Sequence, residues 1–354
     1  MKKKKILFVN ASLSNGGSER VMVLLANELS SRNFDVSMIV LDSDKETYKP
    51  RDNVRIIKID TKNAKTKIKK RLLQIMGIRK IIKTHAFSNV ISFMQEVNVI
   101  TLIASFGINQ QIIVSERCNP EVRKKDIWYY LAKLLYKKSK TVVIQTEQVR
   151  NMLFKNIRKK CAVIPNPVNN DIPDQYIGKR KKVIVAAGRL TEQKNFNLLI
   201  DAFSDVCKKH SDYILKIYGK GPLYKELTDY INQKDLSANV KLMGFVEDLN
   251  NQMNSASMYV STSNYEGISN TMIESLAMGI PTICTDCPVG GASLMIKHEK
   301  NGVLIPVGDK EKLVYYMNKI IEEKSFSEYI SNNAVKVKKE YSVKNIADKW
   351  VDLL

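Results

Sequence analysis

Short apolar runs alternate with segments of helical periodicity along the whole chain. Continuous apolar runs are typical of strands buried on both faces of a parallel sheet, and apolar residues three or four positions apart indicate helices. In the first half, the predicted strands span residues 6–9, 36–41, 54–59, 90–93, 112–115, 141–145 and 162–164. In the second half, they span residues 183–187, 214–218, 240–243, 258–260, 282–284 and 302–305. Strands that alternate with helices in this way predict a doubly wound α/β fold.

The length of the chain predicts two domains. A chain of 354 residues exceeds the size at which a single hydrophobic core stops growing. A stretch rich in Pro, Asn and charge separates the two sets of predicted strands. We therefore expect a first domain over residues 1–170, a linker over 171–182 and a second domain over 183–340.

Two acidic residues flank a predicted helix start in the second half, Glu266 and Glu274 in the sequence EGISNTMIE. If the helix opens at Ser269, Asn270 and Thr271, its first backbone N–H groups and the positive end of its dipole can hold a phosphate. The two carboxylates could then accept hydrogen bonds from hydroxyls on either side of that phosphate. A nucleotide sugar carries ribose, diphosphate and hexose in this order. The competing interpretation is a solvated loop acid followed by an acid near a helix start.

Two basic residues, Arg189 and Lys194, follow the predicted strand 183–187. They fall in a strand-to-helix loop, which is where doubly wound sheets bind ligands. Because Lys and Arg are mostly exposed in any protein, ordinary surface residues are the alternative. Together with the two acids, the pair predicts a site for an anionic ligand in the second domain.

A series of motifs occurs in a fixed order along the chain. They are GGSER at 16–20, SER at 115–117, GRL at 188–190 with Lys194, YGKGP at 218–222, the 266–274 segment continued by SLA at 275–277, and NGVL at 301–304. Together they resemble family 4 of the retaining glycosyltransferases, in the form found in capsule and surface-polysaccharide members. The resemblance runs from residue 6 to about residue 309. It implies a GT-B fold, in which two Rossmann-like domains face each other across a cleft and a last helix, here about 341–354, crosses back to the first domain.

The resemblance also implies an activity. A hexose or N-acetylhexosamine would move from a UDP-sugar to a lipid-linked oligosaccharide, with retained configuration and without a metal or other cofactor. Arg189 and Lys194 would stabilise the charge that grows on the leaving diphosphate, while Glu266 would hold hydroxyls of the transferred sugar. Further donor contacts are implied for Glu274 at the ribose, for Phe245 and Val246 at the nucleobase, and for Gly16, Gly17, Gly219, Ser269, Asn270 and Thr271 at the phosphates.

One feature departs from the family pattern. Many members carry a His near the reacting sugar, whereas this chain has three His residues in other settings. The sequence SER at 115–117 stands where that His is expected. We therefore predict, on the acceptor side, that Glu116 and Arg117 contact the acceptor or the donor, with a buried ion pair as the competing interpretation.

The positive charge is concentrated in the first half. Residues 1–178 hold 33 Lys and Arg against 15 Asp and Glu, and residues 179–354 hold 24 against 21. Segment 61–83 places Ile68, Leu72, Ile75 and Ile82 at near-helical spacing among basic residues, and segment 124–138 adds aromatic residues and lysines. Both predict docking on an anionic membrane, unless their apolar faces pack on the same domain. No nucleic-acid-binding pattern is present in the sequence, so we expect no nucleic-acid partner.

Other sequence features bear on location. Five scattered cysteines predict reduced thiols in the cytoplasm, although Cys284 and Cys287 could form a redox or half-zinc pair. The first apolar run is too short for a signal peptide, and no run reaches the ~18 residues of a membrane-spanning helix. We expect a peripheral protein on the inner face of the plasma membrane. Alternatives on the same fold are a nucleotide-sugar epimerase, a soluble sucrose- or trehalose-type synthase and a catalytically silent scaffold.

Overall fold

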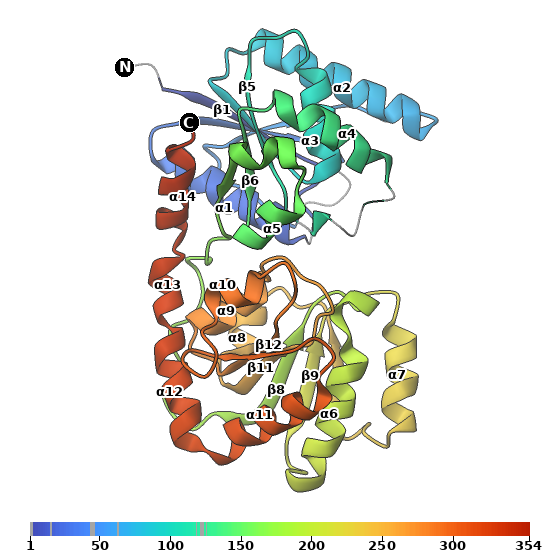
Figure 1. Ribbon diagram of the computed structural model, residues 1–354, viewed down its shortest axis with the longest axis vertical. Coiled ribbons are helices and arrows are strands. Elements are labelled where there is room, and N and C mark those ends of the chain that lie inside the picture. The colour runs from blue at the N-terminus through green and yellow to red at the C-terminus, as the bar shows by residue number, and fades with distance from the viewer. Residues whose placement is uncertain are drawn as a thin grey trace. The chain divides into compact units, whose positions relative to one another are not determined.

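The computed structural model describes residues 3–14, 16–42, 47–61, 64–117, 119–120, 124 and 126–354. The chain divides into two compact units (Figure 1). The first unit comprises Met1–Pro167 and Val343–Leu354, and the second comprises Val168–Ser342. The predicted linker, residues 171–182, therefore belongs to the second unit, and its last residues already form part of a strand.

The first unit is built on a parallel sheet with the strand order β3-β2-β1-β4-β5-β6-β7. Its strands are β1 (Lys5–Asn10), β2 (Asp35–Val40), β3 (Arg55–Lys58), β4 (Asn89–Phe93), β5 (Gln111–Ser115), β6 (Thr141–Ile144) and β7 (Cys161–Val163). Its helices include α1 (Gly17–Ser31), α2 (Lys67–Thr84), α3 (Gln95–Ala104), α4 (Ile127–Leu135), α5 (Glu147–Met152) and α14 (Val343–Val351).

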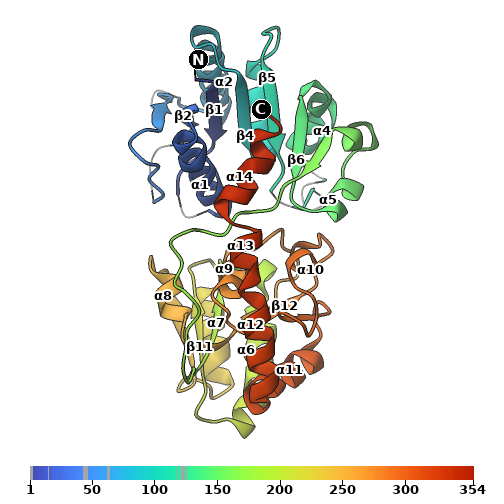
Figure 2. The same cartoon turned by 90° about the vertical axis from the view of Figure 1, so that its left-hand side faces the viewer.

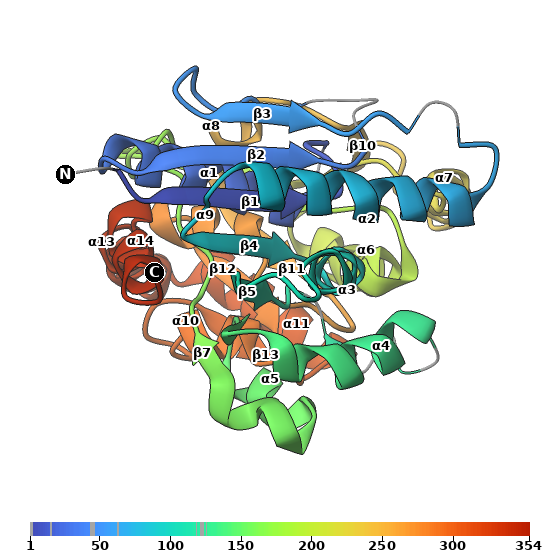
Figure 3. The same cartoon turned by 90° about the horizontal axis from the view of Figure 1, so that it is seen from above.

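The helices cover both faces of this sheet. Helices α1 and α14 pack against each other on one face (Figure 2). On the opposite face, α3 lies between α2 and α4 (Figure 3). Trp350 of α14 is fully buried and stacks on Phe93 at the end of β4, with ring centroids 5.8 Å apart. The C-terminal helix is therefore an integral part of the first unit's core.

The second unit is built on a parallel sheet with the strand order β10-β9-β8-β11-β12-β13. Its strands are β8 (Lys181–Ala187), β9 (Ile214–Tyr218), β10 (Val240–Gly244), β11 (Ala256–Ser261), β12 (Thr282–Thr285) and β13 (Val303–Ile305). Its helices include α6 (Phe196–Lys209), α7 (Tyr224–Gln233), α8 (Leu249–Met253), α9 (Asn270–Ala277), α10 (Gly291–Met295), α11 (Lys310–Glu322), α12 (Lys324–Ala334) and α13 (Lys336–Glu340).

Both sheets are doubly wound, because the strand order reverses between β1 and β4 in the first unit and between β8 and β11 in the second. Every strand predicted from the apolar runs overlaps an observed strand, so the predicted fold class is confirmed. In such sheets ligands bind at the carboxyl ends of the strands where the order reverses. A ligand site in the second unit is therefore expected at the loops after β8 and β11.

Over the described residues, no helix is both long enough and apolar enough to cross a membrane.

Candidate functional site

The loops that leave β8 and β9 are joined through their backbones. The Gly188 N–H donates to the Tyr218 carbonyl at 2.9 Å, and the Leu190 N–H donates to the Lys220 carbonyl at 3.0 Å. Gly219 has φ +141°, and a Cβ at this position would lie 1.8 Å from the Gly188 carbonyl oxygen. Only glycine allows this approach. Gly219 therefore shapes the β8 loop through its backbone.

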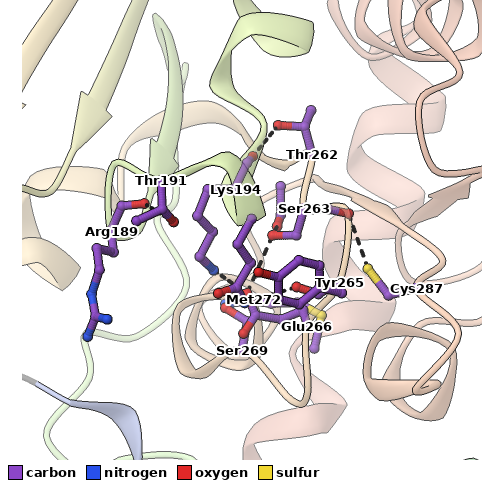
Figure 4. Close-up of polar contacts among 12 residues, drawn as sticks. Arg189, Thr191, Lys194, Thr262, Ser263, Tyr265, Glu266, Ser269, Met272 and Cys287 are labelled. Carbon is purple, nitrogen blue, oxygen red and sulfur yellow. Dashed lines mark hydrogen bonds and ion pairs between the residues drawn. The ribbon is translucent and has the colours of Figure 1, made fainter. Parts of the chain in front are cut away.

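An ion pair between Lys194 and Glu266 joins the loops after β8 and β11 (Figure 4). The Lys194 Nζ donates to Glu266 Oε2, and Ser263 Oγ lies 3.4 Å from the same carboxylate oxygen, to which it donates. The side chains are only 14% exposed for Lys194 and 24% for Glu266. The structure thus brings two of the predicted catalytic residues together at the reversal of strand order.

A set of hydrogen bonds, which we call the β11 latch, fixes the backbone that carries this ion pair. The buried Thr262 hydroxyl donates to the carbonyls of Lys194 and Asn195, at 3.0 Å each. The Asn264 N–H donates to the Gln193 carbonyl at 2.8 Å. Asn195 has φ +46° and caps α6 by accepting from the Leu198 N–H at 3.3 Å. The latch thereby holds the Lys194 backbone to β11.

Helix α9 begins as the sequence predicts. Ser269 is its N-cap, and the Ser269 hydroxyl accepts from the Met272 N–H at 3.4 Å. Asn270 and Thr271 form the first turn, and Glu274 lies in the next turn with its side chain buried. The positive end of the α9 dipole therefore follows Glu266 by a few residues.

The other predicted donor contacts in this unit are more exposed. Arg189 lies on the surface, and Figure 4 shows its guanidinium pointing away from Lys194 and Glu266. Phe245, just after β10, is 41% exposed, so its side chain is not part of the core. The neighbouring Val246 is half-buried. In the structure, Arg189 does not join the Lys194–Glu266 pair.

Gly16 and Gly17, predicted to contact the donor phosphates, lie at the start of α1, where the Glu19 carboxylate is next to Gly16. Gly16 is the N-cap of α1 and Gly17 is its first residue. The Glu19 carboxylate folds back over Gly16, where a Cβ would lie 2.0 Å from Glu19 Oε2. That carboxylate accepts from Ser18 Oγ at 2.6 Å and from Ser12 Oγ at 3.2 Å. In this structure the Glu19 carboxylate occupies the space next to Gly16.

Glu116 and Arg117 are both buried but do not form the ion pair that was the competing interpretation. The fully buried Tyr136 hydroxyl donates to Glu116 and accepts from Asn98 Nδ2 at 3.0 Å. Within the described chain, Arg117 Nη1 donates to the Asn166 side-chain oxygen at 2.9 Å rather than to a carboxylate. Burial lowers the pKa of the Arg117 guanidinium to about 9, which leaves it protonated at neutral pH.

The described cysteines are unpaired thiols. Cys284 lies in β12, and the Cys287 thiol donates to the Ser263 carbonyl at 3.2 Å. Burial raises the pKa of both thiols. Residues 3–14, 16–42, 47–61, 64–117, 119–120, 124 and 126–354 contain no group of three or more His, Cys, Asp or Glu that could hold a metal ion. Cys118, also predicted to be a reduced thiol, lies outside the described residues.

The apolar residues of the basic helix α2, predicted from segment 61–83, differ in burial. Ile78 and Ile82 are buried against the first unit. Ile68, Leu72 and Met76 are instead 75%, 54% and 66% exposed. Of the residues at near-helical spacing, Ile82 is therefore buried, whereas Ile68 and Leu72 are exposed. Residues 62 and 63 of that segment lie outside the described residues.

Helix α4 adds a second exposed apolar stripe on the same side of the sheet (Figure 3). Ile127, Tyr130 and Leu134 are 62%, 58% and 57% exposed. Tyr136 is fully buried, so its predicted contribution to an interfacial aromatic cluster is wrong. Residue 125 lies outside the described residues. We call the exposed stripes of α2 and α4 the apolar docking surface, made of Ile68, Leu72, Met76, Ile127, Tyr130 and Leu134.

Sequence reasoning missed the residues that position the site. Only Asn195 had a readable signal, because Asn directly before an apolar-periodic segment is a common helix N-cap. Thr262 and Asn264 act through a neighbouring loop, and Tyr136 acts on Glu116 across the core of the first unit. Such contacts depend on which strands become neighbours.

Comparisons with known proteins agree with this arrangement. Residues 168–337 match the family model "Glycosyl transferases group 1", and residues 15–172 match "Glycosyltransferase Family 4". The chain is 26% identical over 358 residues to the GalNAc-alpha-(1->4)-GalNAc-alpha-(1->3)-diNAcBac-PP-undecaprenol alpha-1,4-N-acetyl-D-galactosaminyltransferase of Campylobacter jejuni, covering 99% of this chain and 98% of that protein. It is 25% identical to the amylovoran biosynthesis glycosyltransferase AmsD of Erwinia amylovora, covering 99% of each protein.

Solved structures show the same fold. The lipopolysaccharide outer core galactosyltransferase WaaB has a TM-score of 0.77 at 18% identity, covering 99% of this chain and 98% of that protein. Anabaena HepE in complex with UDP has a TM-score of 0.82 at 20% identity, covering 98% of each chain. This likeness confirms the predicted GT-B fold.

The β11 latch predicts a large effect from a change of only one atom. In Thr262→Val the side chain keeps its shape but loses the hydroxyl, so the Lys194 and Asn195 carbonyls lose a buried donor. We expect the free energy of unfolding to fall by about 1–3 kcal/mol in urea denaturation. Thr262→Ser keeps the hydroxyl and serves as the control. Equal stability of the Val and Ser variants would contradict the latch.

Proposed function

This chain belongs to glycosyltransferase family 4, in its group 1, and from that membership we propose that it transfers a hexose or N-acetylhexosamine from a UDP-sugar to a lipid-linked oligosaccharide, with retention of configuration. The observation that carries the proposal is the Lys194–Glu266 pair, placed at the reversal of strand order beside the start of α9. A cation and an acid in one place suit a ligand that presents both phosphate and sugar hydroxyls.

The donor diphosphate binds where Lys194 and the first turn of α9 meet. The Lys194 ammonium and the positive end of the α9 dipole both stabilise the negative charge that grows on the leaving diphosphate. Arg189 reaches the same diphosphate only after its exposed side chain changes rotamer, because it now points away (Figure 4). The two basic residues supply this charge without a metal ion.

The acids hold the sugars of the donor. When a phosphate pairs with Lys194 in place of Glu266, the Glu266 carboxylate becomes available to accept hydrogen bonds from hydroxyls of the transferred sugar. Glu274, buried on α9, accepts from the ribose hydroxyls. Phe245 and Val246 pack on the nucleobase, for which the exposed ring of Phe245 provides an apolar face.

The configuration at the sugar C1 is retained because the acceptor hydroxyl attacks C1 from the same face from which the diphosphate leaves. The bond between the sugar C1 and the phosphate oxygen breaks, and a bond from the acceptor hydroxyl oxygen to C1 forms on the same side. The acceptor proton passes to an oxygen of the departing diphosphate. This step needs no protein nucleophile, and no atom changes oxidation state in a way that would require an oxidant or a reductant.

The acceptor is a lipid-linked oligosaccharide, because the name of the Campylobacter jejuni relative gives that enzyme a sugar linked to PP-undecaprenol as its acceptor. The first unit is strongly basic, which suits an acceptor that carries an anionic diphosphate. It has 35 Lys and Arg against 15 Asp and Glu, whereas the second unit has 22 against 21. The apolar docking surface lies in this basic unit. We therefore propose that the protein binds peripherally to the cytoplasmic face of the membrane.

The surroundings of the apolar docking surface favour an anionic bilayer. Helix α2 has seven basic residues and no acidic residue in its sequence KIKKRLLQIMGIRKIIKT. Lys70 pairs with Asp42, and Arg71 pairs with Glu96, so these two charges also serve the fold. Lys67 and Lys69 are exposed beside Ile68. Apolar side chains rimmed by lysines on one helix are typical of interfacial binding.

Removal of either half of the ion pair tests the catalytic assignment. In Lys194→Ala and in Glu266→Ala, we expect the rate of sugar transfer to fall by at least about 100-fold, because charge stabilisation or sugar binding in the transition state is lost. Each variant should still unfold in one cooperative thermal transition, with a midpoint lowered by the loss of the partly buried ion pair. Product formation from a UDP-sugar and a lipid-linked acceptor provides the measurement.

A matched control uses another ion pair of the same unit. Lys182 and Asp212 form an exposed pair, with side chains 52% and 54% exposed. Lys182→Ala should leave transfer unchanged. Full activity in Lys194→Ala or Glu266→Ala would remove that residue from the site.

The docking proposal predicts separate apolar and electrostatic contributions to membrane binding. The triple variant Ile68→Ser, Leu72→Ser, Met76→Ser should sediment less with anionic liposomes than the wild type, because each exposed side chain contributes about 1.5–3 kcal/mol of apolar burial at most. Charge reversal at Lys65, Lys67 and Lys69 should have the same effect and spares the pairs of Lys70 and Arg71.

The control for this experiment lies in the second unit. Tyr315 and Tyr329 are 57% and 53% exposed, and replacing both by Ser should leave sedimentation unchanged. Wild-type sedimentation of the α2 triple variant would rule out this surface as the membrane contact.

A further inference from the structure

A cation that has no acidic partner among the described residues lies at the carboxyl end of β5. Arg117 follows β5 by two residues and is only 8% exposed. Its guanidinium lies over the Phe93 ring, 4.3 Å from the centroid, and 5.7 Å from the ring centroid of Trp350. Phe93 ends β4 and Trp350 belongs to α14. Three elements therefore fix the position of this guanidinium.

One part of the guanidinium is used by the fold. Nη1 donates to Asn166 Oδ1 at 2.9 Å, and the same oxygen accepts from Gln145 Nε2 at 2.8 Å. Nε and Nη2 are buried and have no hydrogen-bond partner in the described chain. The N–H bonds of these two atoms run parallel along one side of an arginine. That side matches two oxygens of a phosphate or carboxylate.

The fold offers Arg117 little compensation for its buried charge. The adjacent acid, Glu116, accepts from the Tyr136 hydroxyl, and the partner of Arg117 is a neutral amide. A buried charge that lacks a counter-ion is strongly unfavourable, and stacking on aromatic rings offsets only part of this. A fixed, charged and unused pair of donors is what an anion-binding site requires.

We propose that Arg117 binds a phosphate group of a substrate through Nε and Nη2. The inference rests on the proposed function only for the source of the phosphate, which is either the donor diphosphate or the diphosphate of a lipid-linked acceptor. Both donor atoms are buried in this structure, so the phosphate reaches them only after neighbouring groups move. The competing role for Arg117 is a structural clamp that joins Phe93, Trp350 and Asn166.

Trp350 provides a reporter next to the proposed site. The chain has two tryptophans, Trp128 and Trp350, so a Trp128→Phe background leaves only the indole that lies beside Arg117. We would titrate this protein with inorganic pyrophosphate, UDP and farnesyl diphosphate and record the emission of Trp350. The readout does not require sugar transfer, so it stands apart from the activity tests of Lys194 and Glu266.

The proposal expects a saturable change of Trp350 emission with at least one of the three diphosphates. A response to UDP but not to farnesyl diphosphate assigns the donor, and the reverse assigns the acceptor. Arg117→Lys keeps the charge but removes the parallel donors, and we expect it to raise the Kd by at least about tenfold.

A second variant keeps the arginine in place. Asn166→Asp puts a carboxylate next to Nη1, and this internal counter-ion should also weaken diphosphate binding by about tenfold. An unchanged Kd in both variants, or no response of Trp350 to any of the three compounds, would overturn the proposal and assign Arg117 to the clamp.

Discussion

The ion pair between Lys194 and Glu266 is the interaction on which the second unit's site depends. Its partners lie 72 residues apart in the chain and meet because β8 and β11 are neighbours at the reversal of strand order. Each charge is partly buried, so each compensates for the desolvation of the other. Lys194 can therefore exchange Glu266 for an anionic group of a ligand. Under the proposed function, a diphosphate would replace Glu266 as the partner of Lys194, and the released carboxylate would accept hydrogen bonds from sugar hydroxyls. One contact would then prepare both halves of the proposed donor site.

The constraint on this pair reaches into the surrounding backbone. Thr262 ties the Lys194 carbonyl to the end of β11, and Gly219 lets the β9 loop approach the β8 loop closely. A buried hydroxyl with two carbonyl acceptors leaves the loop little freedom, which suits a cation that must meet a developing charge at one point. The first unit differs in kind. It carries the basic excess, the exposed apolar stripes and a buried arginine with unused donors.

Much of the fold was predictable from the sequence, because strands buried on both faces must be apolar without interruption. The start of α9 at Ser269 and the candidates Lys194 and Glu266 were also predictable, since a helix cap and loop charges are local signals. The contact between those two charges was not, because it depends on strand order. Helical spacing likewise could not show that Ile82 is buried while Ile68 is exposed, since the two residues lie near the same side of the helix and differ in their position along it. The buried state of Arg117 depends on Trp350, which lies at the far end of the chain.

The central claim is that the second unit binds a UDP-sugar through the loop and helix that carry Glu266 and Glu274. The most direct measurement is the thermal unfolding midpoint of the protein with UDP-, GDP- and ADP-sugars in turn, without added metal. Binding to the folded state raises the midpoint by mass action. The account predicts a rise with a UDP-sugar that is lost in Glu274→Ala. No rise with any nucleotide sugar, or a rise that survives in Glu274→Ala, would contradict it.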